Sequence, residues 1–178
     1  MKTGSSFCGV ITCIALSVST GGQATKTENV TYTFIAEIVV APCRINGNKS
    51  INIDFGELPV SDVVAGRINR KKEISVSCSF FQGTPFIKVN GAQLAGAADN
   101  VLQTNITSFG VALYQGEGTS TPLHLNGTGN GYPVYTGLSD PNRAESNFTF
   151  TAIPYWSGNG ELPTGTFIGT ATMNIIYL

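Results

Sequence analysis

Apolar and polar residues alternate in this chain with a period of two, and this alternation limits the folds that the chain can adopt. From Val30 to Ile38, alternate positions carry apolar side chains, which is the pattern of a β-strand with one apolar face. The same pattern predicts further strands over residues 50–55, 73–80, 86–90, 108–115, 147–154 and 167–177. Because the period is two rather than 3.6, we expect an all-β protein.

Short stretches rich in Gly, Asn and Pro separate the predicted strands. Residues of these types favour turns. The predicted turns lie at residues 46–48, 90–91, 126–131, 140–142 and 157–160. Many short strands joined by turns are typical of an antiparallel β-sandwich of the immunoglobulin-like type.

The first 24 residues have the organisation of a secretory signal peptide. Lys2 precedes an apolar run over residues 7–18, and a small-residue stretch follows it and ends at Ala24. We therefore expect residues 1–24 to be removed and the mature chain to begin near Thr25. The apolar run is too short to span a bilayer stably, and no later stretch approaches the roughly 18 apolar residues that a membrane helix needs. The sequence thus predicts an exported protein without a membrane anchor.

Size and charge restrict the partners of the mature chain. Removing the first 24 of 178 residues leaves about 154, which suits one domain. Without Lys2 the chain carries nine basic and eleven acidic residues, and this slightly negative balance argues against a nucleic-acid partner. Charged residues make up 12 % of the sequence, below the roughly 25 % of ordinary soluble domains, which suggests that partners cover much of the surface.

The cysteines predict one disulfide bond. Cys8 and Cys13 lie in the signal peptide, so the mature chain keeps Cys43 and Cys78. Two cysteines in an oxidising compartment most simply pair with each other. The residues before Cys8 and Cys13 lack the pattern of a lipoprotein signal, and we expect no lipid anchor.

The sequence contains no recognisable catalytic or metal-binding constellation. His124 is the only histidine, so a catalytic triad or a multi-histidine metal site would have to be built around it. The Gly-rich stretch 127–131 lacks the following helix and lysine of a phosphate-binding loop. The basic residues 70–72 open a predicted strand, where a solvated edge is the simpler interpretation. We expect neither enzymatic activity nor a cofactor or metal ion.

The predicted strand from Val30 to Ile38 stands before Pro42 and Cys43. Since the disulfide should pin Cys43 into the sandwich, residues 25–40 could separate from the domain as an arm, which leaves residues 41–178 as the domain itself. An apolar arm on an exported protein needs an apolar groove to cover it.

These features in order resemble the pilins of chaperone–usher fimbriae over the whole mature chain. The resemblance depends on the alternating arm before Cys43, on Ile53-Asp54-Phe55-Gly56 between the two cysteines, and on Tyr177 and Gly165 near the C-terminus. Residues 100–107 and 109–116 are especially similar to the minor tip-adaptor subunits of P-type pili, which link an adhesin to the tip fibre.

The resemblance implies an immunoglobulin-like fold that lacks its last strand and is completed in trans by a donor strand. A periplasmic chaperone would fill the resulting groove first, and at the outer-membrane usher the arm of the next subunit would replace it. The arm residues that would enter a neighbour's groove are Val30, Tyr32, Phe34, Ala36 and Ile38. The chaperone would dock on the C-terminal strand through Gly165, Phe167, Gly169, Ala171, Met173, Ile175, Tyr177 and Leu178. Ala36 stands where the family usually has Gly, and its extra methyl group would restrict which partner accepts the arm.

The function expected from this resemblance is that of a structural tip adaptor that reaches the cell-surface fimbrium through the periplasm. Its expected partners are the chaperone, the usher and neighbouring subunits, including an adhesin. The alternatives are a fimbrial adhesin and a pilus terminator, which would lack a groove for another arm. A secreted hydrolase would need a cluster of acid, base and nucleophile, and the sequence shows no such cluster.

Overall fold

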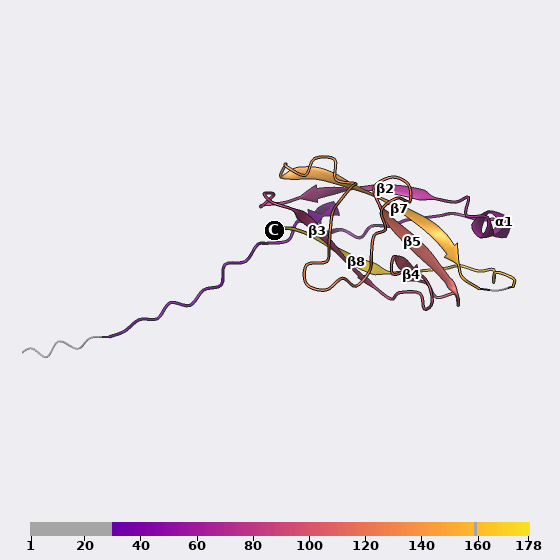
Figure 1. Cartoon of the computed structure of the whole chain (residues 1–178), viewed down its shortest axis with the longest axis horizontal. Helices are drawn as coiled ribbons and strands as arrows, with labels where there is room; N and C mark the ends of the chain where they lie inside the picture. Colours follow the sequence, from indigo (N-terminus) through magenta and orange to yellow (C-terminus); the bar gives the residue numbers. More distant parts are fainter. Residues whose placement is uncertain (1–29, 159) are drawn as a thin grey trace, which may run out of the picture. The chain divides into compact units, whose positions relative to one another are not determined.

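The computed structural model describes residues 30–158 and 160–178 of the chain (Figure 1). Strands dominate it, and the one α-helix has five residues. The elements are β1 (Arg44–Ile45), a 3-10 turn (Asn46–Asn48), α1 (Val60–Val64), β2 (Arg70–Ser77), β3 (Pro85–Gly91), β4 (Val101–Gln103), β5 (Phe109–Gln115), β6 (Tyr132–Pro133), β7 (Glu145–Trp156) and β8 (Ala171–Tyr177). The all-β prediction is confirmed.

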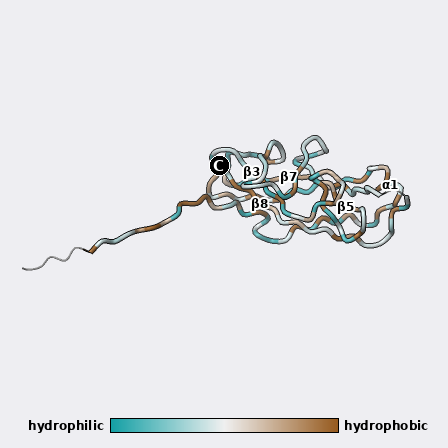
Figure 2. Tube along the Cα trace, turned by 60° about the horizontal axis from the view of Figure 1, so that its bottom comes forward, coloured by the Kyte–Doolittle hydropathy of each residue, from teal (hydrophilic) through white to brown (hydrophobic). Residues whose placement is uncertain are grey.

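Two antiparallel sheets form the fold. The five-stranded sheet has the order β1-β2-β7-β5-β4, and the three-stranded sheet has the order β6-β3-β8. The tube of Figure 2 changes repeatedly between hydrophobic and hydrophilic colours along the chain, as expected for strands with one buried face. The inner faces meet in a core that includes Val76, Ile87, Phe148 and Ile175, each at most 2 % exposed.

The disulfide prediction is confirmed, because Cys43 and Cys78 are bonded to each other. Cys43 immediately precedes β1 and Cys78 immediately follows β2, and β1 pairs with β2 over only two residues. The backbone N–H of Cys43 also donates to the C=O of Ile175 at 2.8 Å. The disulfide therefore joins β1 to β2 beside the end of β8.

Two predicted strands do not form. Residues 30–38 and residues 50–55 have no strand assignment in the structure. A β-strand exists only where a neighbouring strand accepts and donates its backbone hydrogen bonds, and neither segment has such a neighbour among the described residues. The prediction of a strand over residues 50–55 is wrong, whereas the pairing of residues 30–38 with a neighbouring subunit stays a prediction.

The other predicted elements differ at their ends. The C-terminal strand begins at Ala171 rather than at residue 167, and the turn predicted at residues 90–91 is the end of β3 instead. Alternation did not predict α1 or the short strands β1, β4 and β6, which are too short to show a period. The turn at residues 46–48 is confirmed, with Asn46, Gly47 and Asn48 all at positive φ.

Residues 38–178 form one compact unit, the body of the protein. Its C-terminus and α1 lie at opposite ends (Figure 1). Residues 30–37 belong to a separate unit, and the side chains of residues 30–37 are exposed. No helix of the described residues is long and apolar enough to cross a membrane.

Candidate functional site

A long groove of about 980 Å³ opens in the body between two facing segments, residues 49–55 and residues 167–174. Core residues of four different strands, β3, β4, β5 and β7, reach its floor. They are Val89, Leu102, Val111, Leu113 and Phe150. A soluble domain normally covers such residues with its own chain, so the groove marks a place where this sandwich is incomplete.

β8 forms one wall of the groove, and among the described residues one of its edges has no strand partner. Its other edge pairs with β3 along its whole length, from Ala171 to Tyr177. The C=O of Ile175 points away from β3, toward Cys43. Since backbone groups point to the same side at every second residue of a strand, the N–H and C=O of Met173 and Ala171 also point away from β3. Among the described residues, no backbone hydrogen bond joins residues 49–55 to residues 167–174. The N–H and C=O groups on this edge of β8 can therefore form backbone hydrogen bonds with an added strand.

The side chains of this wall alternate as the sequence predicts. Ile175 and Tyr177 are buried, and Met173 and Phe167 are half-buried on the same face. Gly165, Gly169 and Ala171 are exposed. The structure thus gathers the residues predicted for chaperone docking along a single edge of the body.

Backbone hydrogen bonds hold the C-terminus on Thr84, the residue just before β3. Leu178 donates its N–H to the C=O of Thr84 at 3.1 Å and accepts from the N–H of Thr84 at 2.8 Å. Gly83 has a φ of +99°, and a Cβ there would collide with the carbonyl oxygen of Leu178. A side chain at residue 83 would therefore displace the C-terminus.

Burial also affects the hydroxyl of Tyr177 at this end of β8. Its burial raises the pKa of the hydroxyl above the ordinary value, and the negative charge of Asp140 raises it further.

Asn105 binds the backbone of Thr166 and Ile168, in the segment of the wall just before β8. Its side chain donates from Nδ2 to the C=O of Thr166 at 3.1 Å and accepts from the N–H of Ile168 at 2.6 Å. Its own backbone N–H donates to the C=O of Ile168 at 3.1 Å. One residue thus replaces a strand partner for the segment just before β8. The sequence pattern gave no sign of this role, because Asn105 lies in a loop without periodicity.

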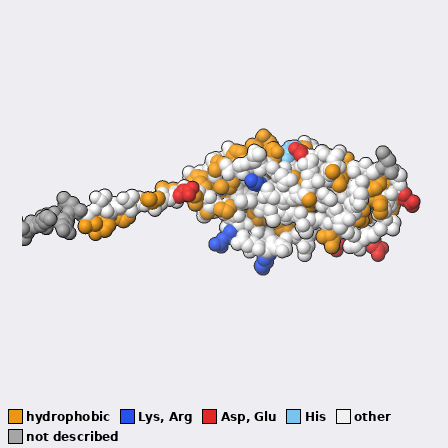
Figure 3. Space-filling model, turned by 90° about the horizontal axis from the view of Figure 1, so that it is seen from below, with side chains coloured by type: hydrophobic (Ala, Val, Ile, Leu, Met, Phe, Trp, Pro, Cys, Tyr) orange, Lys and Arg blue, Asp and Glu red, His pale blue; other side chains and the backbone are white. Residues whose placement is uncertain are grey.

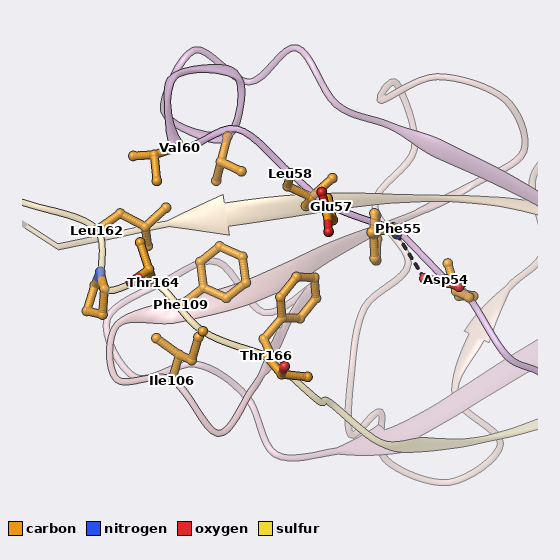
Figure 4. Close-up of a pocket in the computed structure, with 16 residues that line it drawn as sticks. Asp54, Phe55, Glu57, Leu58, Val60, Ile106, Phe109, Leu162, Thr164 and Thr166 are labelled. Atoms are coloured by element: carbon orange, nitrogen blue, oxygen red, sulfur yellow. Dashed lines mark hydrogen bonds between the residues drawn. The ribbon is translucent and has the colours of Figure 1, made fainter.

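A smaller hollow of about 420 Å³ continues the groove toward α1 (Figure 4). Ile53, Asp54, Phe55 and Phe167 line both cavities, so the two are continuous. Aromatic rings form much of its inner surface: the ring centroid of Phe167 lies 5.6 Å from that of Phe55 and 4.9 Å from that of Phe109.

Among the described residues, the carboxylates of Asp54 and Glu57 line this hollow and no basic residue lines it. Asp54 accepts from the N–H of Gly56 at 2.8 Å, shown as the dashed line in Figure 4. Within the described part of the chain, the carboxylate of Glu57 forms no hydrogen bond or ion pair. The α1 end of the groove is therefore apolar inside and acidic at its border.

The predicted arm residues are exposed in the structure. Phe34 is 94 % and Ile38 is 100 % exposed, and Val30 and Tyr32 are also largely exposed, with Ala36 between them. Alternation places the five on one face of an extended segment. Large apolar side chains with this exposure need another surface to cover them.

The other residues considered from the sequence lie outside the groove. His124 is half-buried, and its Nδ1 lies 2.6 Å from Oδ1 of Asp99. Arg70 donates to the C=O of Phe55 at 3.0 Å, and Lys71 pairs with Glu117, so the basic run supports the strand edge. Across residues 30–158 and 160–178, no three His, Cys, Asp or Glu side chains are grouped so that they could hold a metal ion.

Comparison with known proteins identifies the family. Residues 29–178 match the family model described as fimbrial protein. The chain belongs to this family. The fimbrial chain is 48 % identical to the fimbrial adapter PapF of Escherichia coli, over 79 % of its own length and 83 % of the relative. It is 47 % identical, over the same shares, to the minor fimbrial protein PrsF of Escherichia coli.

A solved structure of the P pilus adaptor subunit PapF matches the fimbrial chain with a TM-score of 0.57 and 40 % sequence identity. The match covers 80 % of the fimbrial chain and all of the solved chain. The resemblance to fimbrial pilins and the predicted immunoglobulin-like fold are thereby confirmed.

Proposed function

We propose that this protein is a minor structural subunit of a chaperone–usher fimbria, a tip adaptor that joins its neighbours by exchanging strands and catalyses no reaction. The observation that carries the proposal is the coexistence of an open groove beside β8 and an exposed apolar arm in the same chain. A groove and an arm that each need a partner make a subunit that can join one neighbour on each side.

The names of the relatives support the adaptor role over the alternatives. PapF is described as a fimbrial adapter and PrsF as a minor fimbrial protein, and neither description is that of an adhesin. The open groove favours a subunit that accepts a further arm over a pilus terminator. In the proposed path, a periplasmic chaperone covers the groove, and at the outer-membrane usher the arm of the next subunit replaces it.

The energetics explain why a chaperone is needed. Burying a large apolar side chain contributes about 1.5–3 kcal/mol, so an arm with four of them contributes on the order of 6–12 kcal/mol to the subunit that receives it. Whole domains are stable by only about 5–15 kcal/mol. A body with an empty groove is consequently marginal, and the chaperone supplies the missing strand until the next subunit arrives.

The arm provides the test of this function. Replacing Phe34 with Asp would place a charge in the neighbour's apolar groove, at a cost of several kcal/mol. The variant should form a normal chaperone complex and fail to attach to the preceding subunit, which can be measured by co-purification of the two subunits. Ile35→Asp is the matched control, because it adds the same charge on the opposite face of the arm. A Phe34→Asp chain that assembled as well as Ile35→Asp would contradict the proposal.

A further inference from the structure

We propose that the carboxylates at the α1 end of the groove select which arm enters it. The groove accepts the arm of a different subunit that carries Lys or Arg at the position equivalent to Glu37, and it disfavours the arm of a second copy of this chain. This inference rests on the proposed function, because it concerns the partner of the same groove.

The direction of an added arm follows from the sheet. Every laddered strand pair in the described structure is antiparallel, including β3 with β8. The free N–H and C=O groups of Ala171 and Met173 can continue this antiparallel ladder. An arm bound in this way runs opposite to β8, so its first apolar residue lies near Ile175 and its last lies near Phe167.

The register follows from length and alternation. The inward-facing row of the wall spans residues 167–175, and the apolar row of the arm spans residues 30–38, so both cover about 30 Å at about 3.3 Å per residue. Directly opposed residues in an antiparallel pair point to the same face. Placing Ile38 opposite Phe167 therefore directs every apolar arm residue inward, and it places Glu37 opposite Ile168. Ile168 is 66 % exposed, so Glu37 would also point outward.

The opposite wall brings Asp54 to the same level. The ring centroids of Phe55 and Phe167 lie 5.6 Å apart, so these two residues face each other across the same end of the groove. Phe55 is buried and Asp54 is exposed, so Asp54 points outward like Glu37. Adjacent strands lie about 4.8 Å apart, so the arm of a second copy would set its Glu37 beside Asp54. Glu57 lies just beyond, on the border of the same hollow.

Neither Arg70 nor Lys49 cancels the repulsion between Glu37 of a second copy and Asp54. Arg70 lies on the β2 side of residue 55, where it donates to the C=O of Phe55, and it does not line the groove. The basic residue that lines the groove is Lys49, on the wall near Cys43 at the far end. In Figure 3 most acidic side chains on the visible face of the body lie toward the right-hand end, which carries α1 in Figure 1, and the Lys and Arg side chains lie toward the other end.

A like-charged neighbour destabilises a strand pair, and an opposite charge stabilises it. Exchanging Glu for Lys at arm position 37 should therefore increase capture of the arm by the groove about tenfold. The apolar residues of the arm are the same in both cases. The groove would therefore distinguish two equally apolar arms by charge alone, and copies of this chain would rarely follow one another in the fibre.

The test is a competition between arm peptides of residues 25–40. The chain from residue 25 onward, with its disulfide intact, is refolded from urea with an equal mixture of the native peptide and a Glu37→Lys peptide, and native mass spectrometry gives the ratio of bound peptides. A Thr33→Lys peptide is the matched control, because it gains a positive charge at an outward position far from Asp54. We expect the Glu37→Lys peptide to exceed the native one by about tenfold at low salt, and by much less at 1 M salt, where the Debye length is about 3 Å.

A variant of the body tests directly whether Asp54 and Glu57 cause the preference. When the chain carries Asp54→Asn and Glu57→Gln, the Glu37→Lys peptide should be captured no better than the Thr33→Lys peptide. A chain with Glu117→Gln, a change outside the groove, should still prefer the Glu37→Lys peptide. Equal capture of the two Lys peptides by the native chain, or an advantage that survives in the double variant, would overturn the charge inference and leave the proposed function intact. If the chain bound no arm peptide at all, the proposed function would fail and the inference with it.

Discussion

Asn105 should control how firmly the groove wall is held. In an Asn105→Ala chain, Thr166 loses the donor to its C=O and Ile168 loses the acceptor of its N–H, while the backbone bond from Asn105 to Ile168 remains. Each hydrogen bond contributes about 1 kcal/mol net, so local opening of the wall should become easier by about 2 kcal/mol. At about 1.4 kcal/mol for each factor of ten, this equals roughly a 30-fold change in the opening equilibrium.

Amide hydrogen exchange measures this opening directly. In the complex with the arm peptide, exchange at Ile168 should accelerate by about that factor when Asn105 is replaced. Asn126→Ala is the matched control, because Asn126 forms the same pair of side-chain bonds with the backbone of Gly91, at 2.8 and 3.1 Å. It should accelerate exchange at Gly91 and leave Ile168 unchanged. Unchanged exchange at Ile168 in the Asn105→Ala chain would refute the reasoning.

Three further predictions concern the disulfide and the C-terminal strand. Replacing Cys43 and Cys78 with Ser opens a 35-residue link and should cost about 3–4 kcal/mol, so the variant should accumulate poorly in the periplasm; two free thiols in the native protein would contradict the pairing. Deleting Ile176, Tyr177 and Leu178 removes the end of β8 and its bonds to Thr84, and co-purification with the chaperone should be lost; wild-type yield would place the docking site elsewhere. Because the pKa of Tyr177 is raised in the folded state, the unfolded chain releases this proton first as pH rises, so the free energy of unfolding should fall above about pH 10. Urea unfolding should show a weaker fall in a Tyr177→Phe chain, and identical pH profiles for the two chains would exclude this origin.

Alternation along the sequence was sufficient for the elements whose pairing lies within the chain. The segments that became β2, β3 and β7 carry the period of two over most of their length, because one face of each packs into the core. β5 was also predicted, although it is buried on both faces. The disulfide was equally predictable, since only Cys43 and Cys78 remain after the signal peptide.

The same alternation was misleading at residues 50–55, which were predicted as a strand and have no strand partner in the described structure. Residues 30–38 also have no strand partner there, as expected of an arm that separates from the domain. Periodicity shows that one face of a segment needs to be buried. It cannot show whether the surface that buries this face belongs to the same chain.

The family resemblance predicted a groove beside the C-terminal strand, but the residues of its floor and the bonds that hold its wall came from the tertiary structure alone. Its floor gathers residues from four strands, and Asn105 meets Ile168 across more than 60 positions of sequence. The fold also places Asp54 and Glu57 on the border of the groove. Alternation and cysteine spacing are local properties that a sequence carries by itself, whereas a groove is a relation between distant segments. Only the packing of the two sheets decides which core residues the chain leaves exposed in the groove and which charged side chains lie next to them.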